Sequence, residues 1–287
     1  MQVMRRTLVA SLATAALAAR IGTGTAAAAD DTLARLRAAG SVRVGFPNQV
    51  PYAYADESGA LTGADAEIAR LVFARMGIAS MNGVLTEFAA LIPGLRADRF
   101  DTVLAMFVTP ARCAQVAFSE PIYAIGQGMV VKSGNAAGIT GYDDFVLKPL
   151  RLAVMAGAAQ AGYAKALGIP QGRVIAFPDG PSAMAAVSAG RADAFAISDL
   201  PARRLLATAG AARGLQLVPD FADPVINGRP ARGYDAFAFR PADTSLRDAF
   251  NQALAGLRET PQFLAAMAPF GFTRANLPDR TTQELCG

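Results

Sequence analysis

The sequence has no histidine among its 287 residues, no tryptophan, and only two cysteines. Without histidine the chain cannot form a Ser-His-Asp or Cys-His catalytic site, an HExxH zinc site, or a site with an imidazole acid or base. Two cysteines are too few for a thiolate zinc site or an iron–sulfur cluster. Residues 126–128 (GQG) lack the third glycine of a dinucleotide-binding loop. We therefore expect neither a metal nor a cofactor.

Charged residues are also sparse, at 17% of the chain against 53% hydrophobic residues. This composition argues against long disordered segments. The net charge of +4 comes mainly from residues 1–29, which hold three arginines and no acid. Without them, 27 minus 3 leaves 24 basic residues against 23 acidic ones. No Lys/Arg-rich run remains, so we expect no nucleic-acid partner.

Residues 1–29 have the pattern of a secretory signal peptide. Arg5 and Arg6 precede an apolar run of about 12 residues, and small residues then form a cleavage site. The run is too short for the ~20 residues of a membrane-spanning helix. We expect cleavage near Ala28 or Ala29 and a mature chain in the periplasm. The arginine pair is also compatible with twin-arginine export.

Export would place the two cysteines, Cys113 and Cys286, in an oxidising compartment. A cysteine pair there usually forms a disulfide. Such a bond would tie the C-terminal tail to the body of the protein. The alternative is two buried free thiols.

The hydrophobic pattern alternates between strand-like and helix-like segments. The expected strands are residues 41–46, 85–88, 101–107, 129–132, 152–154, 174–177, 193–197 and 233–239. The expected helices are residues 63–76, 88–97, 161–167, 182–189, 245–258 and 262–268. This alternation predicts an α/β fold with largely parallel sheets. A weak internal repeat, in which a helix and a polar turn lead to Asp101 or Asp193 and a buried strand, indicates two similar lobes.

No catalytic constellation stands out in the sequence. Asp65 and Glu67 fall at the start of an expected helix, where acids interact favourably with the helix dipole. We expect both to be solvated. The lack of catalytic chemistry in an exported, two-lobed chain favours binding over enzymatic function.

Candidate binding residues follow the expected buried strand 101–107. Ligands of open α/β sheets collect at the carboxyl ends of strands, and Arg112 at such a place can hold a carboxylate through two parallel hydrogen bonds. Phe107, Phe88 and Tyr52 also lie at strand or loop ends. With Arg112 they would form a cage for a ligand that has a carboxylate and a delocalised cation. The alternatives are a surface arginine and rings that only pack in the core.

The sequence resembles the solute-binding proteins of polar amino-acid ABC importers, and most closely those that bind ectoine and hydroxyectoine. The resemblance spans essentially all of the chain after residue 29. The segments that carry it best are residues 85–95 (LTEFAALIPGL), 107–113 (FVTPARC), 174–180 (VIAFPDG), 269–272 (PFGF) and 281–286 (TTQELC).

The resemblance implies a type II fold of two α/β lobes, with a mostly parallel sheet in each lobe and two hinge strands. The first lobe would comprise residues 30–123 and 235–287, and the second lobe residues 124–234. The protein would be a monomeric, non-enzymatic binding subunit of an ABC importer. It would capture ectoine or hydroxyectoine, a small zwitterionic ligand, between its closing lobes and deliver it to a membrane permease.

The resemblance also assigns individual residues. Arg112 corresponds to the arginine that binds the ligand carboxylate, and Phe107 to a ring of the aromatic cage. Tyr52 stands where the ectoine binders have a phenylalanine, and Phe88 where they have a tyrosine, so the two ring types are exchanged.

Three further features depart from the family pattern. Gln49 stands where an acid would pair with the cationic ring of the ligand. Ala158 and Ala159 replace threonines, which leaves backbone N–H groups to contact a carboxylate. Ser198 stands where general amino-acid binders place an aspartate that faces the ligand ammonium.

The alternatives to an ectoine importer subunit are a binder of a polar or cyclic amino acid, a sensor that signals to a membrane receptor, and a periplasmic enzyme such as a cyclohexadienyl dehydratase.

Overall fold

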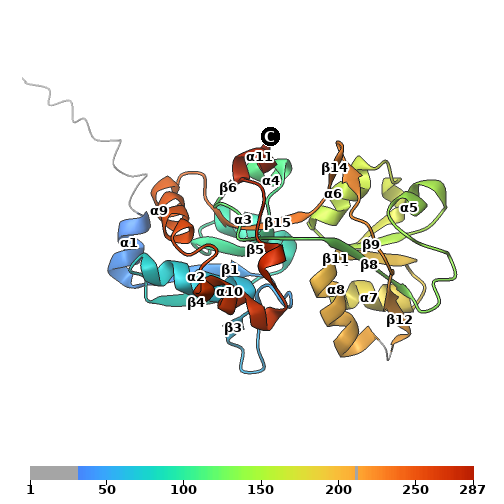
Figure 1. Cartoon of the computed structure of the whole chain (residues 1–287), viewed down its shortest axis with the longest axis horizontal. Helices are drawn as coiled ribbons and strands as arrows, with labels where there is room; N and C mark the ends of the chain where they lie inside the picture. Colours follow the sequence, from blue (N-terminus) through green and yellow to red (C-terminus); the bar gives the residue numbers. More distant parts are fainter. Residues whose placement is uncertain (1–31, 211–212) are drawn as a thin grey trace, which may run out of the picture.

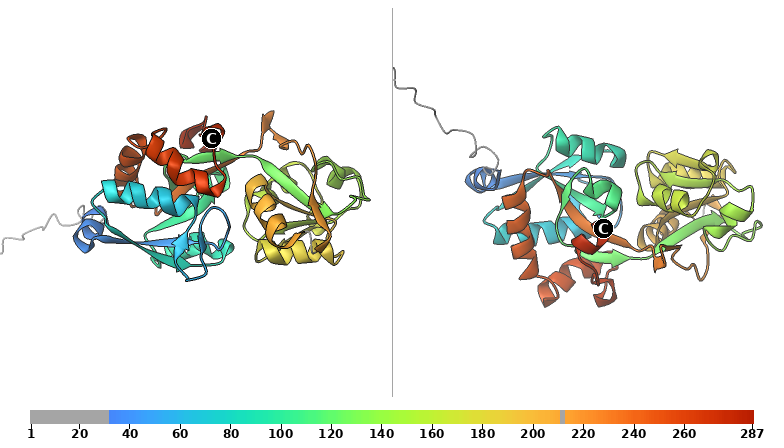
Figure 2. Two further views of the ribbon diagram at one scale, coloured as in Figure 1. Left: turned by 60° about the horizontal axis from the view of Figure 1, so that its bottom comes forward. Right: turned by 90° about the horizontal axis from the view of Figure 1, so that it is seen from above.

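The computed structural model describes residues 32–210 and 213–287, and the expected signal peptide lies outside these residues. Two lobes lie side by side and are joined by extended segments (Figure 1). Two further views show the same division, with the C-terminus on the first lobe (Figure 2). Each lobe has helices packed around one sheet, the layered α/β arrangement that the alternating sequence predicts.

The sheet of the first lobe has the strand order β4-β1-β5-β15-β6, and β7 also pairs with β15. Its strands are β4 (Ser80–Leu85), β1 (Ser41–Phe46), β5 (Thr102–Phe107), β15 (Gly233–Phe239), β6 (Ala117–Phe118) and β7 (Tyr123–Ile125). The helices of this lobe are α1 (Thr32–Ala39), α2 (Ala64–Arg75), α3 (Leu91–Arg96), α4 (Pro110–Cys113), α9 (Thr244–Ala255), α10 (Pro261–Met267) and α11 (Thr282–Cys286). A small hairpin of β2 (Tyr54–Ala55) and β3 (Leu61–Thr62) projects from it.

The sheet of the second lobe has the strand order β10-β9-β11-β8-β12. Its strands are β10 (Val174–Phe177), β9 (Leu152–Met155), β11 (Ala194–Ser198), β8 (Gln127–Lys132) and β12 (Leu215–Leu217). Its helices are α5 (Asp143–Leu147), α6 (Ala159–Ala166), α7 (Gly180–Ser188) and α8 (Asp199–Leu205). A short hairpin of β13 (Val225–Ile226) and β14 (Arg229–Pro230) follows.

Both sheets are mixed, whereas the sequence predicted mostly parallel ones. Each sheet has three parallel strands, β4-β1-β5 and β10-β9-β11, extended by antiparallel strands. The antiparallel strands β15 and β8 are those through which the chain enters a lobe from the other lobe. A parallel pairing needs a crossover connection, usually helical, and β15 and β8 are reached without one. The hydrophobic pattern of a single segment does not reveal how that segment is connected, so it could not predict these antiparallel pairs.

One expected element was wrong. The strand predicted at residues 85–88 lies earlier, at Ser80–Leu85, and Phe88 begins a 3-10 turn, η1 (Phe88–Ala90). The strand β4 lies at the sheet edge and is largely exposed or half-buried. Its polar residues therefore hide the alternation by which a buried strand is recognised. Asp65 is a second error, because it is fully buried rather than solvated.

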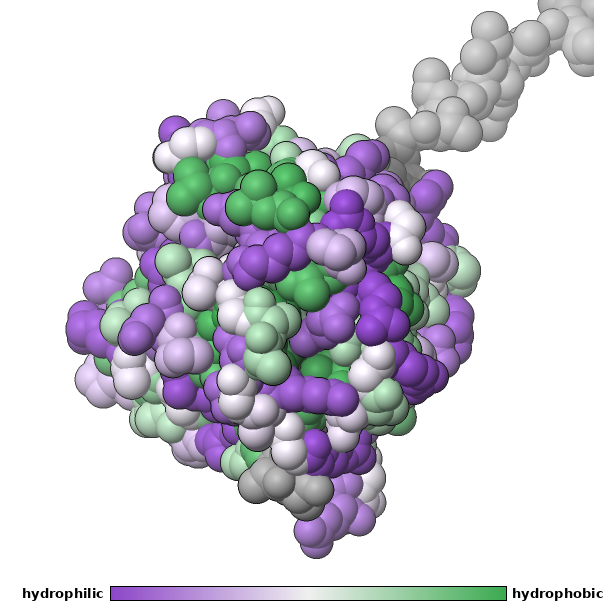
Figure 3. All heavy atoms as spheres, turned by 90° about the vertical axis from the view of Figure 1, so that its right-hand side faces the viewer, coloured by the Kyte–Doolittle hydropathy of each residue, from purple (hydrophilic) through white to green (hydrophobic). Residues whose placement is uncertain are grey.

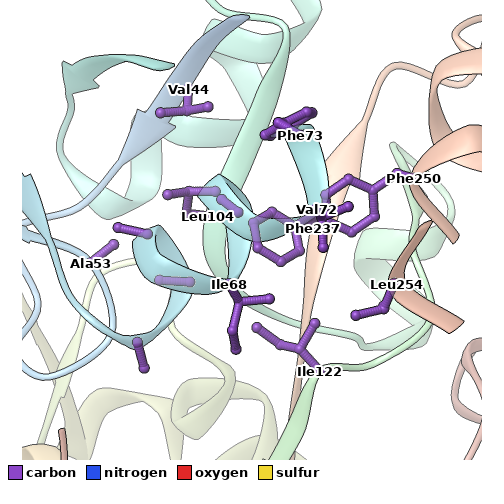
Figure 4. Packing of buried hydrophobic residues seen from close by; sticks show 14 of the residues in the cluster. Val44, Ala53, Ile68, Val72, Phe73, Leu104, Ile122, Phe237, Phe250 and Leu254 are labelled. Atoms are coloured by element: carbon purple, nitrogen blue, oxygen red, sulfur yellow. The ribbon is translucent and has the colours of Figure 1, made fainter. Parts of the chain in front are cut away.

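Aromatic rings dominate the core of the first lobe. The ring of Phe250 on α9 lies 4.6 Å from that of Phe237 on β15 and 5.4 Å from that of Phe73 on α2 (Figure 4). In the second lobe, separate apolar clusters cover the two faces of the sheet. Neighbouring residues of β8 divide between these clusters, since Val130 belongs to one and Val131 to the other. Each lobe thus has its own core.

Two strand segments connect the lobes. β7 pairs with β15 in the first sheet and continues through Gly126 into β8 of the second sheet. In the return direction, β15 pairs with β7 in the register Gly233 to Ile125 and Asp235 to Tyr123. On these pairings we propose the division into residues 30–123 with 235–287 and residues 124–234, so that the hinge lies where β7 and β15 run side by side.

No helix among residues 32–210 and 213–287 is long and apolar enough to cross a membrane. The end face of the second lobe is mostly polar, with a compact hydrophobic patch near the top of the view (Figure 3). Such a patch is an ordinary feature of a protein surface.

Candidate ligand-binding site

A cavity of about 360 Å³, part of it open to solvent, lies between the two lobes. Its lining residues are Gln49, Tyr52, Phe88, Ala105, Phe107, Arg112, Met155, Ala158, Ala159, Gln160, Ala196, Ile197 and Ser198. Several of them stand at or just after the carboxyl ends of β1, β5, β9 and β11, where ligands of open α/β sheets gather. All seven residues predicted to bind ligand, from Gln49 to Ser198, line this one cavity.

Arg112 lies on α4, directly after β5, and is 7% exposed. Its guanidinium donates hydrogen bonds to the carbonyl oxygens of Phe107, at 2.6 Å, and of Gly157 in the second lobe, at 3.0 Å. Within the described residues it forms no salt bridge. Burial lowers its pKa to about 10, so it stays charged at neutral pH. A buried cation without an ion-pair partner leaves a place for an anion.

The backbone that carries Arg112 is fixed by a covalent bond. The structure joins Cys113 and Cys286 in a disulfide, as predicted, with Cα atoms 5.8 Å apart. The bond ties α11 at the C-terminus to α4 within the first lobe. It therefore supports the segment next to Arg112 without bridging the two lobes.

The three predicted rings do not form a symmetric cage. The rings of Tyr52 and Phe107 meet edge to face, with centroids 6.1 Å apart. Phe88 instead lies under the guanidinium of Arg112, 5.3 Å from its ring centroid. One face of the Phe88 ring is therefore occupied by a cation–π contact with Arg112. Tyr52 and Phe107 both line the cavity, and Tyr52 also stacks on Tyr123, with ring centroids 5.8 Å apart.

Tyr52 also brings a polar atom to the site. A tight turn positions it, in which the amides of Tyr52 and Ala53 both donate to the carbonyl of Gln49, at 2.9 and 3.2 Å. The side chain is 1% exposed, and burial raises the pKa of its hydroxyl well above the usual value. That hydroxyl makes no hydrogen bond of good geometry among the described residues, although Ser198 lies close enough to lower its pKa. A buried, unpartnered hydroxyl is costly, so a ligand acceptor would satisfy it.

The second lobe contributes small and polar groups. Ser198 is 1% exposed at the end of β11, and Ala159 begins α6. The first N–H groups of an α-helix have no acceptor within the helix. Ala159 and Gln160 stand in this first turn and line the cavity, whereas the amide of Ala158 already donates to the carbonyl of Met155 at 3.1 Å.

Gln160 is a lining residue that the sequence reasoning missed. Its side chain is 4% exposed, and its Nε2 donates to the Oε1 of Gln127 on β8 at 2.8 Å. The Oε1 of Gln160 takes no part in this bond and is left as an acceptor at the cavity wall. The signal in the sequence was its position directly after the two alanines. Met155, Ala105 and Ile197 were also missed, because apolar strand residues give no sign of which ones line a site.

Two wider grooves adjoin the cavity. One, of about 1210 Å³ including space open to solvent, shares Gln49 and Phe88 with the cavity. The other, of about 2040 Å³, shares Arg112 and is lined by Tyr163 and Arg280 among others. Burial raises the pKa of Tyr163 to about 12, so it is neutral beside Arg112. The cleft thus continues from the cavity toward solvent on more than one side.

Two α/β lobes with a hinge of paired strands and a cavity between them define the type II solute-binding proteins. The family model for bacterial extracellular solute-binding proteins, family 3, matches residues 42–271. The chain belongs to this family.

Individual relatives are similar along most of their length. A probable amino-acid ABC transporter periplasmic-binding protein, y4tE, of Sinorhizobium fredii is 38% identical over 261 residues, 89% of this chain and 86% of the relative. The lysine/arginine/ornithine-binding periplasmic protein of Escherichia coli is 28% identical over 253 residues, 85% of this chain and 90% of the relative.

Solved structures show the same fold. The crystal structure of EhuB in complex with hydroxyectoine is 32% identical, with a TM-score of 0.81, over 90% of this chain and 98% of that one. The ancestral amino-acid-binding protein AncCDT-1, described as a precursor of cyclohexadienyl dehydratase, is 26% identical, with a TM-score of 0.71, over 83% of this chain and 99% of that one.

Proposed function

We propose that this protein is the periplasmic binding subunit of an ABC importer and that it captures ectoine or hydroxyectoine between its lobes. The observation that carries the proposal is Arg112, a buried cation without an ion-pair partner in a cavity that also holds two aromatic rings. An arginine in this position suits a carboxylate. The rings of Tyr52 and Phe107 suit a flat, delocalised cation.

The cavity wall favours this ligand class over an ordinary α-amino acid. No lining residue described for the cavity is an aspartate or glutamate. A compact ammonium group is strongly hydrated and would need a carboxylate in a buried site. A cyclic amidinium spreads its charge and needs only rings and neutral acceptors, which Tyr52, Phe107 and Gln160 supply. The likeness to EhuB with hydroxyectoine supports the same ligand.

A polar or cyclic amino acid is the second candidate. It is supported by the relative that binds lysine, arginine and ornithine and by solved ancestral proteins bound to arginine or glutamine. Arginine in particular has a delocalised side-chain cation. An enzymatic role has less support, because a dehydratase needs a proton donor in the cleft and Gln49 stands where we would seek one.

Calorimetry on the chain from residue 30 onward tests the proposal. The panel is ectoine, hydroxyectoine, arginine, lysine and proline, each titrated under the same conditions. We expect the two ectoines to bind with a Kd at least tenfold below those of the amino acids, a difference of about 1.4 kcal/mol. A basic amino acid as the tightest ligand would instead select the second candidate.

Transport requires partners outside this chain. We infer that the closed form of the protein docks as a monomer on a membrane permease, and that residues 1–29 direct export. Uptake of labelled hydroxyectoine by cells with and without the gene tests the transport role. Loss of a signalling response with unchanged uptake would instead indicate a sensor.

A further inference from the structure

Two carboxyl groups are buried together in the first lobe, next to the ligand cavity. Asp65 on α2 is completely buried and Asp235 on β15 is 1% exposed. Neither lines the cavity itself. Asp235 pairs in register with Phe107 and with Tyr123, so it lies on the hinge strand beside a cavity ring.

Few hydrogen bonds satisfy these two carboxyl groups. The Tyr123 hydroxyl donates to Oδ1 of Asp65 at 2.6 Å. The second oxygen of Asp65 and both oxygens of Asp235 make no hydrogen bond of good geometry among the described residues, although Tyr123 and the Met106 amide approach Asp235 and lower its pKa. Two acids that lie together in such surroundings cannot both be ionised. A proton held between them would satisfy both the charge and an unpartnered oxygen.

The backbone beside the pair is irregular. In β5, Ala105 has a φ of 59°, and the register with β15 shifts between Ala236 and Ala238. This bulge brings the amides of Ala105 and Met106 near Asp65 and Asp235, and both amides lower the pKa of the acid they approach. Ala105 also lines the cavity. The bulged strand β5 thus lies next to both the acidic pair and the cavity.

The charged and titratable groups around the pair come from several elements. Burial raises the pKa of Asp65 to about 7, while the Tyr123 hydroxyl, the Ala105 amide and Asp235 lower it. Burial and then the charge of Asp65 raise the pKa of Asp235, against the charge of Arg112 on α4. The charges of both acids, and that of Asp199 on α8, raise the pKa of Tyr52. Arg112 is the cation that acts on Asp235, and Asp235 raises the pKa of Arg112 in return.

We propose that Asp65 and Asp235 hold one proton between them at neutral pH, supply the counter-charge of Arg112 in the ligand-free protein, and take up a second proton when a ligand carboxylate binds Arg112. The two aspartates are positioning residues, since neither touches the ligand. The proposal rests on the proposed function only in its last part, the arrival of a carboxylate at Arg112.

The coupling follows from charge balance. In the ligand-free protein the single negative charge of the pair stabilises the buried guanidinium. A bound carboxylate replaces that counter-charge and adds a like charge close to the pair. The cation of a zwitterionic ligand is delocalised over its ring against Tyr52 and Phe107, so in this proposal it offsets that like charge only in part. The ionised member then binds a proton from the solvent, with formation of one O–H bond and no other change. Binding with net proton uptake weakens as the pH rises, by at most tenfold in affinity per pH unit for one proton.

The first test needs no ligand. In protein labelled with ¹³C at the aspartate carboxyls, NMR across pH 4 to 9 should show two signals that titrate together, far above the usual aspartate pKa of about 3.9. In Asp235→Asn, the signal of Asp65 should titrate in a single step, without coupling to a second acid. Asp65→Asn gives the reciprocal result for Asp235. Glu67→Gln, a change on the same helix at a half-exposed carboxylate, should leave both signals unchanged.

The second test measures protons on binding. Calorimetry with hydroxyectoine at pH 7, in phosphate and in Tris, gives the net proton uptake from the difference in apparent enthalpy. We expect uptake in the wild type and in Glu67→Gln, and its loss in Asp235→Asn. Equal enthalpies for the wild type in both buffers would overturn the coupling.

The two tests separate the two ideas. If hydroxyectoine does not bind, the proposed ligand is wrong, while the NMR titration still decides whether the pair holds a proton. If both carboxyls titrate independently near pH 4, the pair does not exist as proposed, whatever the ligand.

Discussion

Arg112 of the first lobe donates a hydrogen bond of 3.0 Å to the carbonyl oxygen of Gly157 in the second lobe. Gly157 follows β9 with a φ of 75°, and its Cα side faces Ala89 of the first lobe. The residue that we assign to the ligand carboxylate is therefore also a contact between the lobes. If Arg112 binds the ligand as proposed, ligand binding and the contact between the lobes use the same guanidinium.

Replacement of Arg112 should remove ligand binding without unfolding the protein. We expect Arg112→Ala to cost on the order of 2–5 kcal/mol of binding free energy, because it leaves a ligand carboxylate buried and unpaired. Arg112→Lys should recover only part of this loss, since lysine cannot form the paired hydrogen bonds. Calorimetry with hydroxyectoine measures both, and Arg99→Ala, at an exposed arginine, is the control. Affinity close to wild type in Arg112→Ala would remove this residue from the site.

A matched pair of glycines tests the contact between the lobes. A Cβ on Gly157 would lie 3.2 Å from the Cα of Ala89, whereas one on Gly168 would meet nothing within 4 Å. Both have positive φ, 75° and 83°, so an alanine at either place costs roughly 1–2 kcal/mol of stability. Only Gly157→Ala should also weaken ligand affinity, by hindering closure. Equal affinities in the two variants would show that the Gly157 contact does not matter for the closed form.

The aromatic pair should discriminate ligands by charge. Phe107→Leu keeps an apolar side chain but removes the ring face, so binding of a delocalised cation should weaken by about 0.5–2 kcal/mol. A neutral ligand of similar shape should lose less. Affinities of hydroxyectoine and of a neutral analogue, measured side by side, give the comparison. Equal losses of affinity for both ligands would mean that the Phe107 ring only packs against the ligand.

The disulfide should matter for stability and little for binding. It closes a loop of 173 positions, for which the chain-entropy model gives roughly 5 kcal/mol at most. Reduction, or the double change Cys113→Ser and Cys286→Ser, should therefore lower the Tm of the ligand-free protein. Affinity should change only modestly, because both cysteines lie in the first lobe. Two alkylatable thiols in protein purified from the periplasm would contradict the bond.

Two buried acids should affect the pH dependence of stability with opposite signs. Asp101 pairs with Arg35 and Arg43, and these bonds hold its pKa at about 2. Its stabilisation is present above the unfolded pKa of about 3.9 and is lost as the pH falls toward 2. The pKa of Asp65 is raised to about 7, so its contribution falls as the pH rises from about 4 to 7.

Denaturant unfolding across pH 3 to 8 measures these two slopes. Asp101→Asn should flatten the acid side of the stability profile, and Asp65→Asn the side between pH 4 and 7. Glu67→Gln, on the same helix as Asp65, should change neither slope. A profile between pH 4 and 7 that Asp65→Asn leaves unchanged would mean that Asp65 titrates normally.

The sequence was informative where function follows from local position. The place of Arg112 directly after a buried strand predicted that it lies at the cavity, because ligands of α/β sheets gather where the strands end. The disulfide was predicted because the chain is expected to be exported and has exactly two cysteines. Alternating patterns located most strands, and the edge strand β4 was missed because its exposed residues carry no alternation.

The remainder depends on contacts between distant segments. Asp65 has the local pattern of an exposed helix-start acid, and only the packing of β15 and β7 over it places it in the interior. Phe88 was assigned to the ligand, but the approach of Arg112 takes up one of its faces. The role of Gln160 depends on Gln127, which is 33 residues away in sequence. No local pattern encodes such pairings.

A crystal structure of the protein with hydroxyectoine tests the central claim most directly. The account predicts the ligand in the cavity between the lobes, with its carboxylate oxygens about 2.7–2.9 Å from the guanidinium nitrogens of Arg112 and its ring against Tyr52 and Phe107. A ligand held elsewhere, or one whose carboxylate does not contact Arg112, would contradict it.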